Sequence, residues 1–119
     1  EMIFERTNTI LYCTHWQETV DFYRDIFCFV VSHETDWFIE FQIASGSYLS
    51  VADTRKATID SNDGRGITLA WKVQDIRAVH TELKRKGIQV TSVKQKWSAE
   101  VFYLHDPEGH RIELWQPAD

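Results

Sequence analysis

The chain has 119 residues, 43% of them hydrophobic and 26% charged, which is the balance of one globular domain that buries its own core. A net charge of −5 argues against nucleic acid or an anionic membrane surface as the main partner. No stretch is apolar enough to span a bilayer or resembles a signal peptide, and the two cysteines have no metal-binding spacing. We therefore expect a cytoplasmic protein with both cysteines, Cys13 and Cys28, as small buried residues.

The first half of the sequence predicts a strand, a helix and three further strands. Thr14 followed by Gln17 has the spacing of a capping box, so a helix should begin there and end near Phe27. Alternating β-branched and aromatic residues predict the strands, and a Ser-Gly pair predicts the turn before the last of them. The predicted strands are residues 8–13, 29–33, 37–44 and 47–53.

A polar stretch without periodicity, residues 54–65, predicts a linker, after which the pattern begins again. Asp75 is a good N-cap, and Gly87 follows a basic run that suits the last turn of a helix. Asp-Pro-Glu-Gly at 106–109 predicts a tight turn. The strands predicted in this half are residues 66–73, 88–93, 99–105 and 110–116.

The two halves have the same predicted order, βαβββ, which indicates an internal duplication. Aligning them places Asn8 opposite Thr68 and Ser50 opposite Glu113, with the starts of the two helices also matched. The predicted fold class is α+β, built from two tandem βαβββ modules that form a curved, mixed sheet. Within a single domain over residues 1–119, we expect module 1 at about 5–53 and module 2 at about 66–117.

Three stretches resemble the vicinal oxygen chelate superfamily, which includes glyoxalase I, extradiol dioxygenases and bleomycin-resistance proteins. They are ETVDFYRDIFCFVV, WKVQDIRAVHTELKRKGIQV and FYLHDPEGHRIELWQP, with Asp-Pro-x-Gly before Ile-Glu-Leu as the most specific part. The resemblance implies that the modules close around a cup. In small members of this family the cup usually combines modules of two chains, so the resemblance also implies a homodimer.

Metal-binding members of the family hold a divalent ion with His or Gln, Glu, His and Glu at four inward positions. The corresponding residues here are Asn8, Ser50, Thr68 and Glu113, of which only Glu113 matches. One carboxylate among neutral oxygen donors is a poor cage for a transition metal, so no cofactor is expected and a divalent metal is disfavoured. His15, His33, His80, His105 and His110 are expected to be surface or boundary residues.

Strand alternation predicts which side chains face the cup, because successive residues of a strand point to opposite faces. The set combines aromatic rings, small hydroxyls, one acid and two bases, as suits a small organic ligand. Trp37 and Trp97 are additional candidates for aromatic walls. The predicted ligand-binding residues are Asn8, Ile10, Tyr12, Tyr48, Ser50, Thr68, Ala70, Lys72, Arg111, Glu113 and Trp115, and Ala52 is expected to face the cup with them.

Glu113 is the candidate catalytic residue, although a carboxylate in such a wall must pair or take up a proton. It could form an ion pair with Lys72 or Arg111, act as a general base, or accept a hydrogen bond from a ligand. The sequence favours a metal-independent, dimeric small-molecule-binding protein of the glyoxalase/bleomycin-resistance type. The alternatives are a lyase, isomerase or dioxygenase-like enzyme that uses Glu113 as base or as its one retained metal ligand, and a structural dimer with a vestigial pocket.

Overall fold

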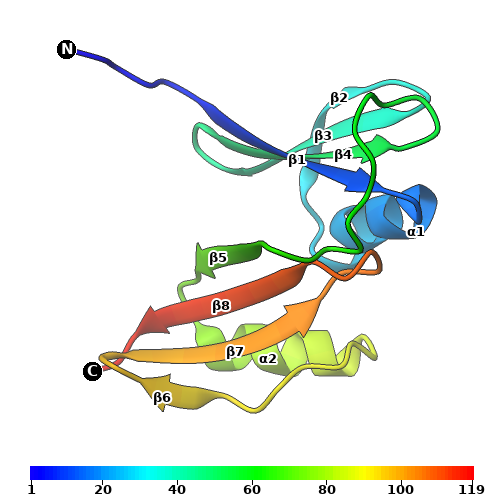
Figure 1. The fold of residues 1–119 in the computed structure, drawn as a ribbon. Coiled ribbons are helices and arrows are strands. Elements are labelled where there is room, and N and C mark those ends of the chain that lie inside the picture. Colours follow the sequence, from blue (N-terminus) through cyan, green and yellow to red (C-terminus); the bar gives the residue numbers. More distant parts are fainter. The chain divides into compact units, whose positions relative to one another are not determined.

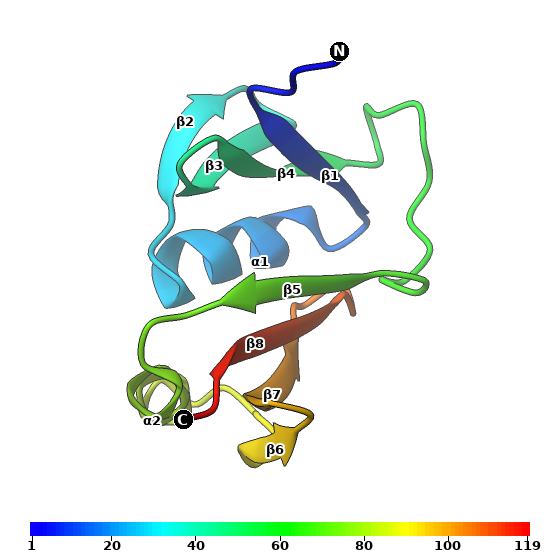
Figure 2. The same ribbon diagram turned by 90° about the vertical axis from the view of Figure 1, so that its left-hand side faces the viewer.

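The computed structural model describes residues 1–119 and divides them into two compact units, Glu1–Asp63 and Gly64–Asp119. Each unit has its own four-stranded sheet with a helix packed on one face of it (Figures 1 and 2). The boundary between the two units lies between Asp63 and Gly64, in the polar stretch of residues 54–65 that was expected to be a linker. No helix in the chain has the length and apolar character needed to cross a bilayer.

Unit 1 is a mixed sheet in which the first and last strands are parallel neighbours. Its strand order is β1-β4-β3-β2, with β1 parallel to β4 and the other pairs antiparallel. The helix α1 continues directly into a short π-helical segment, η1. The elements are β1 (Thr7–Cys13), α1 (Trp16–Asp21), η1 (Phe22–Ile26), β2 (Val30–Glu34), β3 (Phe38–Ala44) and β4 (Ser47–Asp53).

Unit 2 repeats this topology with the order β5-β8-β7-β6 and with β5 parallel to β8. Its elements are β5 (Thr68–Lys72), α2 (Ile76–Arg85), β6 (Lys94–Lys96), β7 (Ala99–His105) and β8 (Arg111–Pro117). The register repeats as well, because Ser50 lies opposite Ile10 and its predicted equivalent Glu113 lies opposite Ala70. The predicted fold class is thus confirmed.

The core of unit 1 is formed by the helix packing its aromatic residues on the sheet. Val20 and Tyr23 are fully buried, and the ring of Tyr23 lies 6.0 Å from that of Phe27 and 6.3 Å from that of Phe41. Burial of rings of this size supplies much of the stabilisation of a small unit. The helix therefore buries its apolar face against the sheet.

In unit 2 the helix α2 begins and ends where its sequence predicts. The Asp75 side chain accepts a hydrogen bond of 3.1 Å from the backbone N–H of Ala78, and Gly87 follows with a φ of 82°. Leu83 is buried against the sheet, and the ring of His80 meets the ring of Phe102 edge-on at 4.8 Å. The face of the sheet that carries Phe102 is therefore the one that α2 covers.

Three local predictions were wrong. The helix α1 begins at Trp16 with His15 as an N-cap that makes no side-chain hydrogen bond, and Gln17 donates to Asp21 at 2.9 Å instead of completing a capping box. Cys28 is exposed, with a φ of 59°, because it lies in the turn that leaves η1, although neither cysteine forms a disulfide.

The third wrong prediction is the strand at 88–93, since the edge strand β6 is three residues long and begins only at Lys94. Thr91 accounts for the difference. Its backbone N–H donates to the carbonyl of Tyr103 at 3.0 Å, but its hydroxyl accepts from the N–H of Tyr103 at 2.9 Å. A side-chain oxygen thus takes the place of the backbone carbonyl, so regular strand pairing does not begin there.

Candidate functional site

Each sheet has one face covered by its helix and one face without a helix, which we call the open face. The predicted ligand-binding residues lie on the open faces, and each lies opposite another of them on the parallel central strands. In unit 1 the pairs are Asn8 with Tyr48, Ile10 with Ser50 and Tyr12 with Ala52. In unit 2 they are Thr68 with Arg111, Ala70 with Glu113 and Lys72 with Trp115.

On the open face of unit 1, two of the family's metal-ligand positions are bonded to each other. The hydroxyl of Ser50, which is fully buried, donates to the Oδ1 of Asn8 at 2.9 Å. The amide Nδ2 of Asn8 donates in turn to Oε2 of Glu40 at 3.3 Å. Both side chains are therefore part of a hydrogen-bond network that extends to a carboxylate on β3.

Glu40 is a half-buried acid of the open face that the sequence alone did not single out. It lies opposite Ser50 in the register, and it also accepts from Arg6 at 2.6 Å and from Ser32 at 2.8 Å. Burial alone would raise the pKa of Glu40, but the hydrogen bonds from Ser32 and Arg6 outweigh it and hold the pKa below its usual value. The available signal was an acid between Ile39 and Phe41 in a predicted strand, just as Glu113 stands between Ile112 and Leu114.

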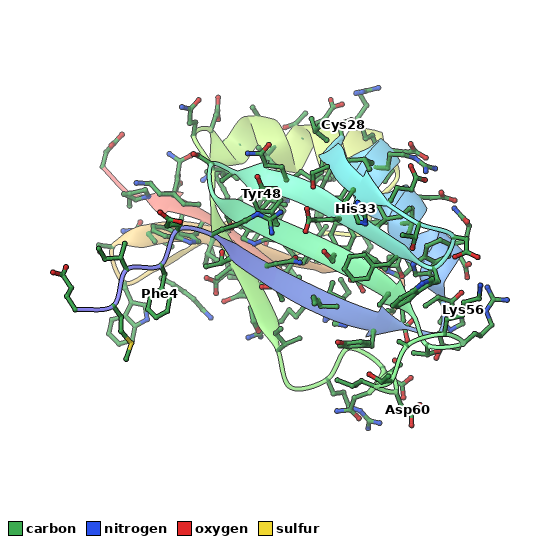
Figure 3. All side chains as sticks on the ribbon, turned by 90° about the horizontal axis from the view of Figure 1, so that it is seen from above. Phe4, Cys28, His33, Tyr48, Lys56 and Asp60 are labelled. Atoms are coloured by element: carbon green, nitrogen blue, oxygen red, sulfur yellow. The ribbon has the colours of Figure 1, made fainter.

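The guanidinium of Arg6 lies over the ring of Tyr48, with its central carbon 3.6 Å from the ring centre, while it donates to Glu40. These contacts place an aromatic ring, a cation and an acid in one self-paired group. Figure 3, which looks onto this sheet, shows Tyr48 and His33 on their strands and Phe4 on the extended N-terminal segment. The charge of Glu40 is thus already compensated by Arg6 of the same chain.

The open face of unit 2 is arranged differently, because its acid is not paired. Arg111 donates from Nε to the hydroxyl of Thr68 at 2.9 Å, and its guanidinium lies 4.9 Å from the centre of the Tyr103 ring. Lys72 lies 5.9 Å from the centre of the Trp115 ring. Neither cation forms the ion pair with Glu113 that the sequence suggested.

Glu113 is half-buried and has no hydrogen-bond or ion-pair partner within the chain. Its neighbours across the register are Ala70 on β5 and Tyr103 on β7. Tyr103 also accepts a hydrogen bond from Lys96 on its hydroxyl, at 3.2 Å. Tyr103 and Lys96 are open-face residues that the sequence reading missed, although Tyr103 alternates with the buried Phe102 and Leu104 in its strand.

The donor set does not fit the divalent ion that the resemblance implies. No group of three or more His, Cys, Asp and Glu side chains is placed to hold a metal. At the family's four positions, Asn8 and Ser50 bond each other and Thr68 accepts from Arg111, so only Glu113 offers a carboxylate. Neutral oxygens that are engaged in this way are weak ligands for a transition metal.

The two tryptophans suggested as aromatic walls lie outside the strands. Trp37 is half-buried just before β3, with its ring 5.6 Å from that of Phe38. Trp97 is 97% exposed in the turn between β6 and β7, with a φ of 57°. Trp115 is the tryptophan that the register places on the open face of unit 2.

One of the five histidines is buried, contrary to the expectation for them. His110 bonds through Nδ1 to Oδ2 of Asp106 at 2.8 Å, and both residues are less than 7% exposed. The other oxygen of Asp106 accepts the backbone N–H groups of Glu108, Gly109 and His110. The Asp-Pro-Glu-Gly-His stretch is therefore a rigid turn that sets the start of β8, the strand of Glu113.

Two βαβββ units of matching register, each with an open sheet face, define the class of fold to which the chain belongs. The sequence profile of the Glyoxalase/Bleomycin resistance protein/Dioxygenase superfamily matches residues 6–114, so the chain is a member of this family. The suspected resemblance is thereby confirmed. No curated protein matches the chain by sequence.

Solved structures share the fold at low sequence identity. A lactoylglutathione lyase from Agrobacterium tumefaciens is 17% identical with a TM-score of 0.79, covering 98% of this chain and 96% of that one. TnmS3, an antibiotic binding protein from Streptomyces sp. CB03234, is 20% identical with a TM-score of 0.81, covering 99% of each chain. A glyoxalase/bleomycin resistance protein/dioxygenase from Nocardioides is also 20% identical, with a TM-score of 0.80. The match covers 100% of this chain and 85% of that one. These similarities establish the fold.

Proposed function

We propose that this chain is a small-molecule-binding protein that holds an organic ligand on the open face of unit 2 without a metal ion. The observation that carries the proposal is Glu113, a half-buried acid without a partner in the chain. An antibiotic-binding protein of the same fold, TnmS3, gives the proposal support by analogy. The enzymatic and vestigial alternatives are separated from it by the experiment below.

The chemistry of this face explains why a ligand is expected. A carboxylate that loses part of its hydration is stabilised when a donor replaces the lost water. A ligand hydroxyl or N–H group can supply that donor to Glu113. The rings of Tyr103 and Trp115 lie on the same face as Glu113 and offer apolar contact area beside it.

The test is a titration of the purified protein with a panel of aromatic compounds, followed by tryptophan fluorescence and by product analysis. Glu113→Gln should weaken binding of any hit about tenfold, in line with loss of a charge-assisted hydrogen bond. The matched control is Glu82→Gln, which alters an acid on the surface of α2 that pairs with Arg85. This control should leave binding unchanged.

Three outcomes would overturn the proposal. If no compound perturbs the fluorescence, the open face is a vestigial surface. If the two variants bind alike, Glu113 takes no part in recognition. If a compound is converted to product and Glu113→Gln abolishes turnover while keeping affinity, the protein is an enzyme of this fold and Glu113 is its base.

We also propose that the protein is a homodimer in the cytoplasm. Met2, Ile3 and Phe4 are 84%, 76% and 84% exposed, and Val30 on the edge strand β2 is 67% exposed. Exposed apolar side chains beside an unpaired strand edge are stabilised by a second copy. The absence of a disulfide between Cys13 and Cys28 suits a reducing compartment.

Light scattering after size-exclusion chromatography measures the mass of the particle and so tests the dimer. The double variant Phe4→Ser, Val30→Ser is expected to shift the equilibrium from dimer toward monomer. A monomeric wild type at micromolar concentration contradicts the proposal. Cell fractionation tests the location.

A further inference from the structure

The cations of unit 2's open face differ from most others of the chain in having no acidic partner. Arg6, Arg24, Arg55, Arg77 and Arg85 each have a nitrogen within 3.2 Å of a carboxylate oxygen. On the open face of unit 2, Lys72, Lys94, Lys96 and Arg111 make no ion pair. Unpaired positive charge is therefore concentrated on one sheet face.

The register shows that these four cations share this face. Lys94 lies opposite Val101 on β7, Val101 lies opposite Trp115 on β8, and Trp115 lies opposite Lys72 on β5. Lys96 is two residues beyond Lys94 and so points to the same side. A row of four strands thus presents four positive groups and one acid, Glu113, in a protein whose net charge is −5.

Two of the four cations are held in place by contacts that leave their charge uncompensated. Arg111 is fixed by Thr68 and by the ring of Tyr103, and Lys96 is fixed by the hydroxyl of the same Tyr103, 3.2 Å away. The ammonium of Lys96 is 5.2 Å from the centre of the Tyr103 ring. Two cations therefore converge on one ring, where their mutual repulsion is relieved by an anion placed between them.

From this arrangement we propose that the ligand is an aromatic anion: a planar molecule with a carboxylate, sulfonate or phosphate group and a hydroxyl. Its anionic group accepts hydrogen bonds from Arg111 and Lys96, its ring packs on Trp115, and its hydroxyl donates to Glu113. This assignment rests on the proposed function and adds the charge of the ligand to it.

The experiment compares three probes that share a ring and a hydroxyl and differ only in charge: hydroxynaphthoate, its carboxamide and its aminomethyl analogue. Calorimetric titration should show that the anion binds at least about tenfold tighter than the amide, with the cation weakest. Raising the salt concentration should weaken binding of the anion and leave binding of the amide nearly unchanged.

Arg111→Met and Lys96→Met should each reduce the preference for the anion about tenfold without changing the affinity for the amide. The control is Arg77→Met, since Arg77 is on α2 and pairs with Glu100. Circular dichroism checks that each variant is folded.

The outcomes separate this inference from the proposed function. If the three probes bind equally, or the cation binds best, the inference is overturned while small-molecule binding stands. It is overturned in the same way if the anion is preferred but Arg111→Met and Lys96→Met behave like Arg77→Met. If none of the probes binds and no compound of the wider panel does, both proposals fail.

Discussion

The hydroxyl of Ser50 donates to the side-chain oxygen of Asn8 across 2.9 Å, from the centre of one strand to its parallel neighbour. In metal-binding members of the family, both positions contribute ligands. Here the two residues satisfy each other, and Asn8 also bonds the acid Glu40. Both side chains are thus engaged in hydrogen bonds within unit 1.

The Asn8–Ser50 pair predicts an asymmetry between two substitutions. Ser50→Ala should cost about 0.5–1.5 kcal/mol of unfolding free energy, because the exposed Asn8 can bond water instead. Asn8→Ala should cost about 1–3 kcal/mol, because it leaves the fully buried hydroxyl of Ser50 without its acceptor. Urea denaturation of the two variants and the double variant measures this difference. Equal costs would mean that the bond is not formed in solution.

Removal of metal should have no effect on the protein. A divalent ion at a hundred times its Kd would stabilise the folded state by about 2.7 kcal/mol, which a thermal melt detects easily. We expect the same Tm after dialysis against a chelator and after addition of nickel, zinc, manganese or magnesium, because Glu113 is the one carboxylate at the four family positions. Stoichiometric metal in the purified protein, with a lower Tm after chelation, would contradict this prediction.

Glu40 predicts a pH dependence of stability below about pH 4.5. Its pKa is held below its ordinary value of 4.5 in the folded protein, so its contribution is fully present above pH 4.5 and is lost as the pH falls through the folded pKa. Glu40→Gln should therefore differ most from the wild type near neutral pH, and this difference should shrink in acid. The size expected is about 0.2–1 kcal/mol, since Arg6 is partly exposed. Denaturation of both proteins between pH 3 and pH 7, with Arg6→Gln as a second variant, provides the measurement.

Gly64 predicts a large effect from a single methyl group. A Cβ at this position would overlap the backbone of Gly109 and His110, and the φ of 75° is strained for alanine. Gly64→Ala should lose roughly 2–5 kcal/mol, combining left-handed strain with overpacking against the turn. Gly66→Ala is the matched control, because its φ of 87° carries similar strain but nothing lies within 4 Å of the added carbon. It should lose only about 1–2 kcal/mol, and similar Tm values for the two variants would show that the close approach is absent.

Strand alternation predicted the sheet face on which the candidate residues lie, since Ile112 and Leu114 are buried and Glu113 between them points to the open face. It could not predict the partner of Arg111. Thr68, Glu113 and Tyr103 all share a face with that arginine, and the choice among them depends on side-chain rotamers and not on the strand pattern. Glu40 could have been found from its own sequence, because it alternates with buried Ile39 and Phe41 as Glu113 does with its neighbours.

Strand pairing in this chain never crosses the junction between Asp63 and Gly64, because the first strand of each unit is a parallel neighbour of its last. All backbone ladders are thus completed within about half of the polypeptide. Cleavage of the chain at that junction would remove no strand pair, because each sheet takes all of its strands from one side of the junction. Substitutions in one half therefore leave every backbone ladder of the other half unchanged.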